Sequence, residues 1–238
     1  MYVRLKHTLS SLALEMFVSP PKGRPIAWLR AYVRLAPDGK SVSLPMLRRE
    51  AAKLGTAGPR SLQRLEEVGL FRRMDRMIGL APEFRPHTAY LVRQVERLAS
   101  ALESLGDDWR GGPQAVLRRG ILLFNSGLFF ECHEYLEDVW RPTTGPDRNF
   151  YHAIIQTAAA FYHFEKDNLH GARTLLAKAL EKLEAYRPAR LGVDVERLIA
   201  DLQQWQRRFA ADQLGRSLRA REFPEIRGRA TIRATVEG

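Results

Sequence analysis

Residues 124–141 read Phe-Asn-Ser-Gly-Leu-Phe-Phe-Glu-Cys-His-Glu-Tyr-Leu-Glu-Asp-Val-Trp-Arg and predict one helix, which begins after Gly127 and ends before Pro142. A helix turns by about 100° per residue, which separates this stretch into an apolar side and an acidic side. The apolar side holds Leu128, Cys132, Tyr135, Leu136 and Val139. The acidic side holds Glu131, Glu134 and Asp138, with Glu137 further round. Such a helix packs its apolar side against neighbouring helices.

Further helices are predicted on both sides of this stretch, at residues 114–126, 148–167, 168–186 and 193–209. Short loops between successive helices favour antiparallel neighbours. The segment 148–167 is apolar almost all round, which is typical of a central, buried helix. The sequence therefore predicts a mainly α protein in which residues 114–212 form an antiparallel helical bundle.

Polar residues inside the predicted bundle are the candidates for its chemistry. His133 and Glu137 lie one helical turn apart, and His152, Gln156 and His163 share one stripe of the central helix. Because buried imidazole and amide groups need hydrogen-bond partners, Glu131, His133 and Glu134 are candidate partners for that stripe. The predicted ligand or metal residues are Glu131, His133, Glu134, Glu137, Gln156 and His163.

Two interpretations of this cluster remain open. A divalent metal ion held by His133, His163 and a carboxylate from Glu134 or Glu137 would have a position for activated water, as in a metal-dependent hydrolase. Alternatively, the cluster is a hydrogen-bond network that determines helix register and has no activity. Cys132, the only cysteine, lies on the apolar side, which disfavours nucleophilic catalysis and excludes an internal disulfide.

The stretch 124–141 is similar to the signature of a bacterial and archaeal domain-of-unknown-function family, number 309. A second block also matches, consisting of residues 156–159, His163, Asn168 and residues 171–172. The resemblance covers about residues 115–185. It implies a small helical bundle, and some family members carry the label of metal-dependent hydrolases by analogy.

The front of the chain, residues 22–85, predicts a different arrangement of helix, short strand, helix, turn, helix and hairpin. Ser43 is a candidate cap for the second helix, and Gly55 a candidate stop. Residues 70–80 alternate loosely around Asp75, as a two-stranded hairpin does. This order resembles a winged helix-turn-helix module. A connecting helix and linker are expected at residues 86–113, and a basic tail at 213–238.

The winged-helix resemblance implies double-stranded DNA as a partner. Its third helix would lie in the major groove and its hairpin would meet phosphates. The corresponding residues are Arg60, Ser61, Gln63, Arg64, Arg72, Arg73 and Arg76. The same fold also serves in protein docking, so that alternative stays open.

Charge is distributed unevenly along the chain, whose formal net charge is +11. Residues 1–85 contain 16 Lys and Arg against 7 Asp and Glu, a balance of +9, whereas residues 86–212 contain 16 against 17. A basic front favours an anionic partner. We therefore expect a DNA-binding regulator whose bundle acts as a sensing or interaction module, with a homodimer as one form. No apolar run is long enough for a membrane span, so the expected location is the cytoplasm.

Overall fold

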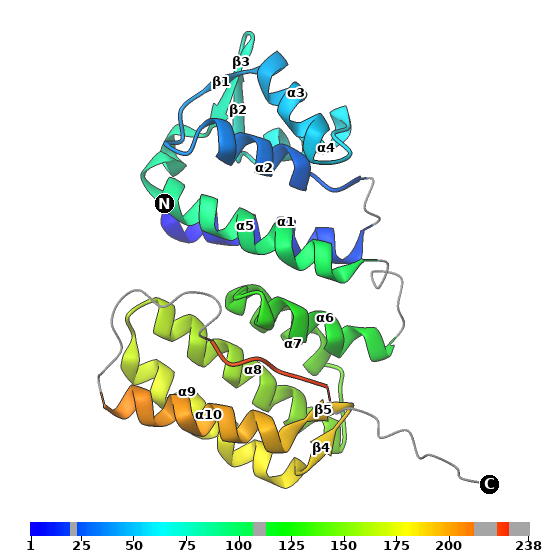
Figure 1. Ribbon diagram of the computed structural model, residues 1–238, viewed down its shortest axis with the longest axis vertical. Coiled ribbons are helices and arrows are strands. Elements are labelled where there is room, and N and C mark those ends of the chain that lie inside the picture. Colours follow the sequence, from blue (N-terminus) through cyan, green and yellow to red (C-terminus); the bar gives the residue numbers. More distant parts are fainter. Residues whose placement is uncertain (20–22, 107–112, 212–222, 229–238) are drawn as a thin grey trace, which may run out of the picture. The chain divides into compact units, whose positions relative to one another are not determined.

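The chain forms two compact units, Met1–Leu122 and Leu123–Gly238, in the computed structural model of Figure 1. The structure describes residues 1–19, 23–106, 113–211 and 223–228. Both units are mainly helical, as the sequence predicts. The expected linker between residues 106 and 113 and most of the basic tail lie outside the described residues.

Unit 1 contains the element order predicted for residues 22–85, with one helix before it and two after it. Its elements are α1 (Tyr2–Val18), α2 (Ile26–Leu35), β1 (Val42–Ser43), α3 (Leu44–Leu54), α4 (Pro59–Glu67), β2 (Phe71–Met74), β3 (Met77–Leu80), the 3-10 helix η2 (Pro82–His87) and α5 (Thr88–Leu105). The predicted cap is present, because the hydroxyl of Ser43 accepts a hydrogen bond from the amide of Met46.

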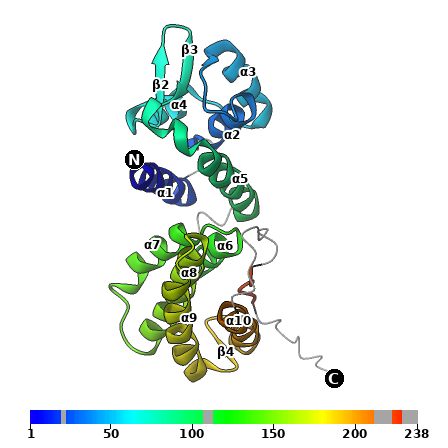
Figure 2. The same cartoon turned by 90° about the vertical axis from the view of Figure 1, so that its left-hand side faces the viewer.

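Helix α1 is an element that the sequence reasoning did not assign. Its apolar side is buried along Leu5, Leu9, Leu12 and Met16, and it packs against α5. The two helices lie side by side in Figure 2, where both are seen end-on. Helix α5 also packs against α2, so the predicted connecting helix is part of the core of unit 1.

The three strands of unit 1 form an antiparallel sheet in the order β1-β3-β2. Met74 pairs with Met77 across a tight turn at Asp75 and Arg76, where the hairpin was predicted. Tyr32 joins α2 to this sheet, because its hydroxyl donates to the carbonyl of Lys40 and accepts from the amide of Leu80. The sheet, α2 and α3 therefore share one core.

Unit 2 is the predicted bundle. The division between the units falls within α6 (Pro113–Asn125), and the helices that follow are α7 (Phe129–Trp140), α8 (Pro146–Glu165), α9 (Leu169–Leu183) and α10 (Val195–Ala210). Helix α8 packs against both α7 and α9, and α9 packs against α10. The expectation that α8 is the central helix is thus confirmed. Asn168 caps α9 by accepting from the amide of Gly171, as predicted.

Two features of unit 2 have no counterpart in the sequence reasoning. The short strands β4 (Ala189–Arg190) and β5 (Val193–Asp194) pair between α9 and α10. Residues 223–228, red in Figure 1, then run across the bundle and end beside β5. A strand contribution was expected from residues 230–232, which lie outside the described residues.

Candidate functional site

Only some of the residues of α4 that were predicted to contact DNA are exposed. Arg60 is exposed on the first turn, and Gln63 is exposed but hydrogen-bonded to Glu67. Ser61 is only 4% exposed, and its hydroxyl donates to the carbonyl of Gly58 and accepts from the indole of Trp28. The expectation that Ser61 faces a partner is therefore wrong, because packing against Trp28 turns that side chain inward.

Three of the predicted arginines are held by carboxylates of unit 1. Arg64 contacts Glu15 at 2.8 Å, and Arg73 donates two hydrogen bonds to Glu66 at 2.8 and 3.0 Å. Arg72 is 3.7 Å from Glu83 in a looser pair. Each of these pairs neutralises charge that was predicted to face phosphates.

Unpaired arginines gather instead around a groove between α3 and the turn of the β2–β3 hairpin. Arg48 and Arg49 of α3 and Arg76 of the turn line it, and their side chains form no ion pair within the described parts of the chain. The groove has a volume of about 470 Å³, and Leu44, Pro45, Ala52 and Asp75 complete its lining. The amide of Leu44 donates to the carbonyl of Arg76, which holds the start of α3 beside the turn.

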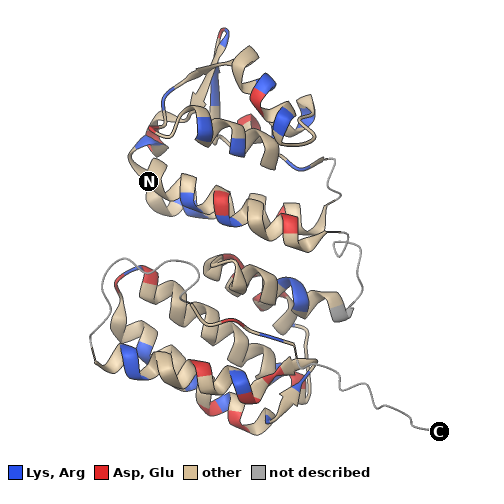
Figure 3. Cartoon of the chain, viewed as in Figure 1, with Lys and Arg blue, Asp and Glu red and all other residues tan. Residues whose placement is uncertain are grey.

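The distribution of charge in unit 1 agrees with this location. Figure 3 shows basic residues on α3 and at the tip of the hairpin, with an acidic residue beside them in each place. Arg48 and Arg49 were missed by the sequence reasoning, which placed contacts on the third helix of the predicted module. Two adjacent arginines directly after a helix cap were the available signal.

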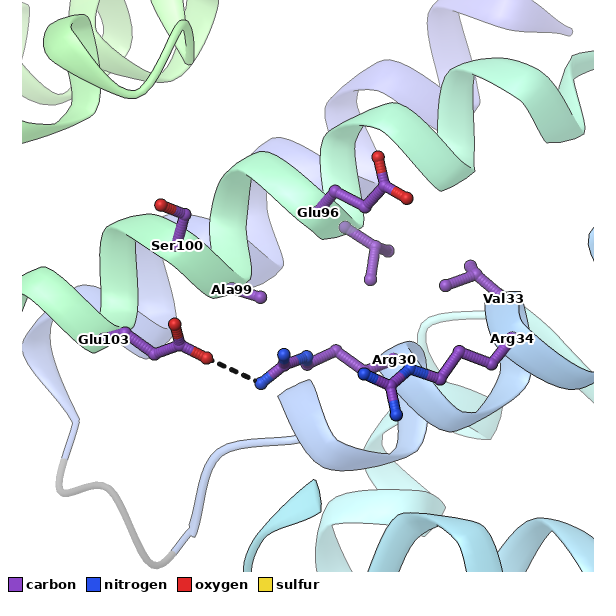
Figure 4. Close-up of a pocket in the computed structure, with 8 residues that line it drawn as sticks. Arg30, Val33, Arg34, Glu96, Ala99, Ser100 and Glu103 are labelled. Carbon is purple, nitrogen blue, oxygen red and sulfur yellow. Dashed lines mark hydrogen bonds and ion pairs between the residues drawn. The ribbon is translucent and has the colours of Figure 1, made fainter. Parts of the chain in front are cut away.

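A second pocket of unit 1, of about 250 Å³, lies between α2 and α5 and is drawn in Figure 4. Arg30 and Glu103 form an ion pair of 2.7 Å at its edge, and Arg34 on the same side is paired with Glu50. Because these arginines are already paired, we expect an anion to bind this pocket more weakly than it binds the groove beside α3.

In unit 2, His133 lies between two carboxylates of its own helix, α7. Its Nδ1 is 3.2 Å from Glu134 and its Nε2 is 3.3 Å from Glu137, so both ring nitrogens face acidic oxygens. Both contacts are hydrogen bonds only when both nitrogens carry protons. Glu137 is also 3.3 Å from Arg141, the helix-surface pair that i,i+4 spacing predicts. His133 therefore lies within a partly exposed row of acidic and basic side chains on α7.

The other predicted members of the cluster do not join His133. His163 is partly exposed, and its Nδ1 accepts from the amide of Asn168 at 2.8 Å. Gln156 is buried, and no described group is hydrogen-bonded to its Oε1. Glu131 is 1% exposed, although the helix pattern put it on the acidic side. His133 and His163 thus have separate local contacts, and the wider network between the histidine stripe of α8 and the acidic residues of α7 stays a prediction.

A divalent metal does not fit these residues. No group of three or more histidine, cysteine or acidic side chains within the described ranges is arranged to hold a metal ion. Both ring nitrogens of His133 face carboxylates of its own helix, and the contact of His163 is with Asn168 through Nδ1, away from His133. We therefore derive no metal-dependent step from this bundle.

Comparison with known proteins places the bundle in a family. Residues 117–175, from α6 to the first half of α9, match the family described as "Domain of unknown function (DUF309)".

Residues 117–175 are therefore similar to a DUF309 domain.

The relative "Uncharacterized protein YpuF" of Bacillus subtilis (strain 168) is 38% identical to the chain over 78 residues. That stretch is 32% of this chain and 45% of the relative, so less than half of the relative's length is spanned. No solved structure matches the chain. None of the described helices is long and apolar enough to cross a lipid bilayer.

The DUF309 domain also has a buried thiol. Burial and the neighbouring Glu131 raise the pKa of Cys132, whose side chain is fully enclosed. A thiol that stays protonated and inaccessible is a poor nucleophile. The position of Cys132 therefore agrees with its assignment to the apolar side of the helix.

A glycine in the DUF309 domain allows close contact between α8 and the start of α9. A Cβ at Gly171 would lie 2.7 Å from Nδ1 of His163 and 2.9 Å from Nδ2 of Asn168. We expect Gly171→Ala to lower the free energy of unfolding by about 1–3 kcal/mol, because overpacking outweighs the higher helix propensity of alanine. Urea denaturation followed by circular dichroism measures this change.

The matched control is the double variant His163→Ala, Gly171→Ala, in which the ring that would clash is absent. Its loss of stability should be smaller than the sum of the losses of the two single variants. Additive losses, or a stabilised Gly171→Ala variant, would contradict the close contact.

Proposed function

We propose that unit 1 binds double-stranded DNA and that the DUF309 bundle serves as a sensing or interaction module, which makes the chain a regulator. The observation that carries this proposal is the groove beside α3, where Arg48, Arg49 and Arg76 have no carboxylate partner among the residues that the structure describes. Arginines without a partner release counterions from a duplex more effectively than arginines that are already neutralised.

The element order of unit 1 supports the same proposal. Two helices, α3 and α4, follow a short strand and precede a hairpin whose turn adjoins the start of α3. In a winged helix-turn-helix module these parts approach the duplex together. We propose Arg60 at the start of α4 as a base-edge or phosphate contact, and the groove arginines as phosphate contacts. A homodimer would place two such surfaces on paired half-sites about 34–36 Å apart.

The metal-dependent hydrolase stays a weaker candidate. Its ligands would have to come from His133, His163 and a carboxylate, and the contacts of these side chains do not converge on one point. A bundle used for interaction needs no such convergence.

The test is a salt titration of duplex binding, measured by fluorescence anisotropy with a labelled random-sequence duplex. Each phosphate contact contributes about 0.9 to the slope of log K against log salt. The triple variant Arg48→Ala, Arg49→Ala, Arg76→Ala should therefore have a slope shallower by about 2.7. Its affinity at low salt should also fall.

The control is the triple variant Arg64→Ala, Arg72→Ala, Arg73→Ala, which removes the same charge from the ion-paired positions. It should change the slope much less. If the parent chain does not bind the duplex, the proposal is wrong. If the control variant changes the slope more than the first variant does, the contact surface lies on α4 and β2 instead.

A further inference from the structure

Residues 223–228 lie across the bundle as an extended segment. The side chains of Pro224 and Ile226 are buried, whereas those of Glu225 and Arg227 are exposed, which is the alternation of a strand with one face inward. Glu225 and Arg227 pair with each other at 2.8 Å on the outer face. The segment therefore meets the bundle with apolar groups and its backbone.

The backbone of this segment forms hydrogen bonds like those between neighbouring strands of a sheet. The side-chain amide of Asn125 donates to the carbonyl of Ile226, and its oxygen accepts from the amide of Ile226, both at 2.9 Å. The amide of Asp194 donates to the carbonyl of Arg227 at 2.9 Å, and Val193 forms a β-bridge with Gly228. Asn125 and β5 thus act as strand partners for the extended segment.

Phe223 anchors the segment in a cluster of aromatic rings. Its ring centre is 5.0 Å from that of Phe129, and its ring stacks on Trp205 at 5.7 Å. Phe161 and Phe164 complete the contact at 5.9 and 6.4 Å. Phe129, Phe161 and Phe164 lie within residues 117–175, whereas the segment itself lies outside that range.

We propose that Asn125, β5 and this aromatic cluster form a binding groove for an extended peptide, and that residues 223–228 are its built-in ligand. Backbone hydrogen bonds to an extended peptide with pockets for selected side chains are the contacts of peptide recognition by strand addition. The groove accepts an aromatic residue, a proline and, three positions after the aromatic, a β-branched aliphatic residue. This inference rests on the interaction role proposed for the bundle and is independent of duplex binding by unit 1.

The occupant we assign is a peptide of this pattern from a partner protein, which competes with the chain's own segment. Twelve residues, 211–222, separate the end of α10 from the segment, and a chain of that length can reach back to Trp205. A hollow of about 240 Å³ lies between the segment and α10, beside Trp205 and Phe223. A short tether gives the built-in ligand an effective concentration on the order of millimolar.

The experiment uses the full chain and a fluorescent peptide of residues 222–229, Glu-Phe-Pro-Glu-Ile-Arg-Gly-Arg. The variant Phe223→Ser, Ile226→Ser empties the groove, and it should bind the peptide saturably in fluorescence anisotropy. The parent chain should bind at least about tenfold more weakly, because the tethered segment competes. Adding Asn125→Ala to the emptied variant should weaken binding about tenfold through loss of two hydrogen bonds.

A peptide with both apolar residues replaced by serine is the matched control and should not bind. Equal binding to parent and emptied variant, or binding insensitive to Asn125→Ala, overturns the proposal. So does a parent dimer that dissociates in the emptied variant, because the occupant is then a second copy. Duplex binding in these variants should equal that of the parent, which separates a failed peptide groove from a failed DNA surface.

Hydrogen exchange on the parent chain tests the same proposal without any substitution. The amides of Ile226 and Asp194 should exchange by local release of the segment, faster than the core amides of α8. If all these amides exchange together, through global unfolding only, the segment is a permanent part of the core. That result overturns the proposal.

Discussion

Replacing Phe161 by alanine is expected to lower the free energy of unfolding of the bundle by about 3–5 kcal/mol. The ring is fully buried in α8, and its centre lies 5.2 Å from Trp205, 5.6 Å from Phe129 and 5.8 Å from Phe124. Three other helices, α6, α7 and α10, therefore lose contact with this side chain, and a cavity remains because the helices cannot close around it. Scanning calorimetry measures the loss as a lowered midpoint of the bundle transition.

Phe164 provides the matched control for this prediction, one helical turn further along α8. It contacts the same Trp205 and Phe223 but is only partly buried. Phe164→Ala should therefore cost less than Phe161→Ala, since the exposed side of the ring gains little from burial. An equal or larger loss for Phe164→Ala would mean that Phe161 is not the centre of this core.

Replacing Trp28 by alanine is expected to destabilise unit 1 by a similar amount, about 3–5 kcal/mol. The indole is buried, and its Nε1 donates to the carbonyl of Gly58 at 3.1 Å and to the hydroxyl of Ser61 at 3.2 Å. It thereby ties α2 to the start of α4, the helix proposed to approach DNA. Calorimetry of the same kind reports the effect, read on the transition of unit 1.

Trp28→Phe separates the hydrogen bonds of the indole from its packing. The carbonyl of Gly58 also accepts from the hydroxyl of Ser61 at 2.8 Å, so it keeps one partner when the indole N–H is removed. The expected loss is therefore about 0.5–1.5 kcal/mol beyond the small change in volume. A loss as large as that of Trp28→Ala would show that the hydrogen bonds, and not the buried ring, hold α4.

Apart from α1, the helices of both units follow from local patterns in the sequence. Apolar periodicity predicts α7, α8 and α10 because a helix places residues three and four apart on one side. Ser43 and Asn168 cap helices where predicted, because an oxygen close to free amides at a helix start acts over only three residues. These features depend on neighbours in the chain, and a single sequence contains them.

The candidate surfaces were predictable only in part. The basic character of unit 1 was visible, but which arginines remain unpaired depends on carboxylates far away in the chain. Glu15 reaches Arg64 from α1, a helix that was not assigned, and Glu83 approaches Arg72 from η2. As a result, the predicted DNA contacts included paired arginines of α4 and β2 and omitted Arg48 and Arg49 of α3.

Helix positions and caps, the central place of α8 and the likeness of residues 117–175 to the DUF309 family were thus determined by the sequence itself. The tertiary structure alone decided that Ser61 is buried against Trp28 and that Ile226 is bonded by Asn125 from 101 positions earlier. The physical reason is the separation along the chain over which each effect acts. Helix periodicity and capping act within a few residues, whereas burial and side-chain pairing depend on which distant segments the folded chain brings together.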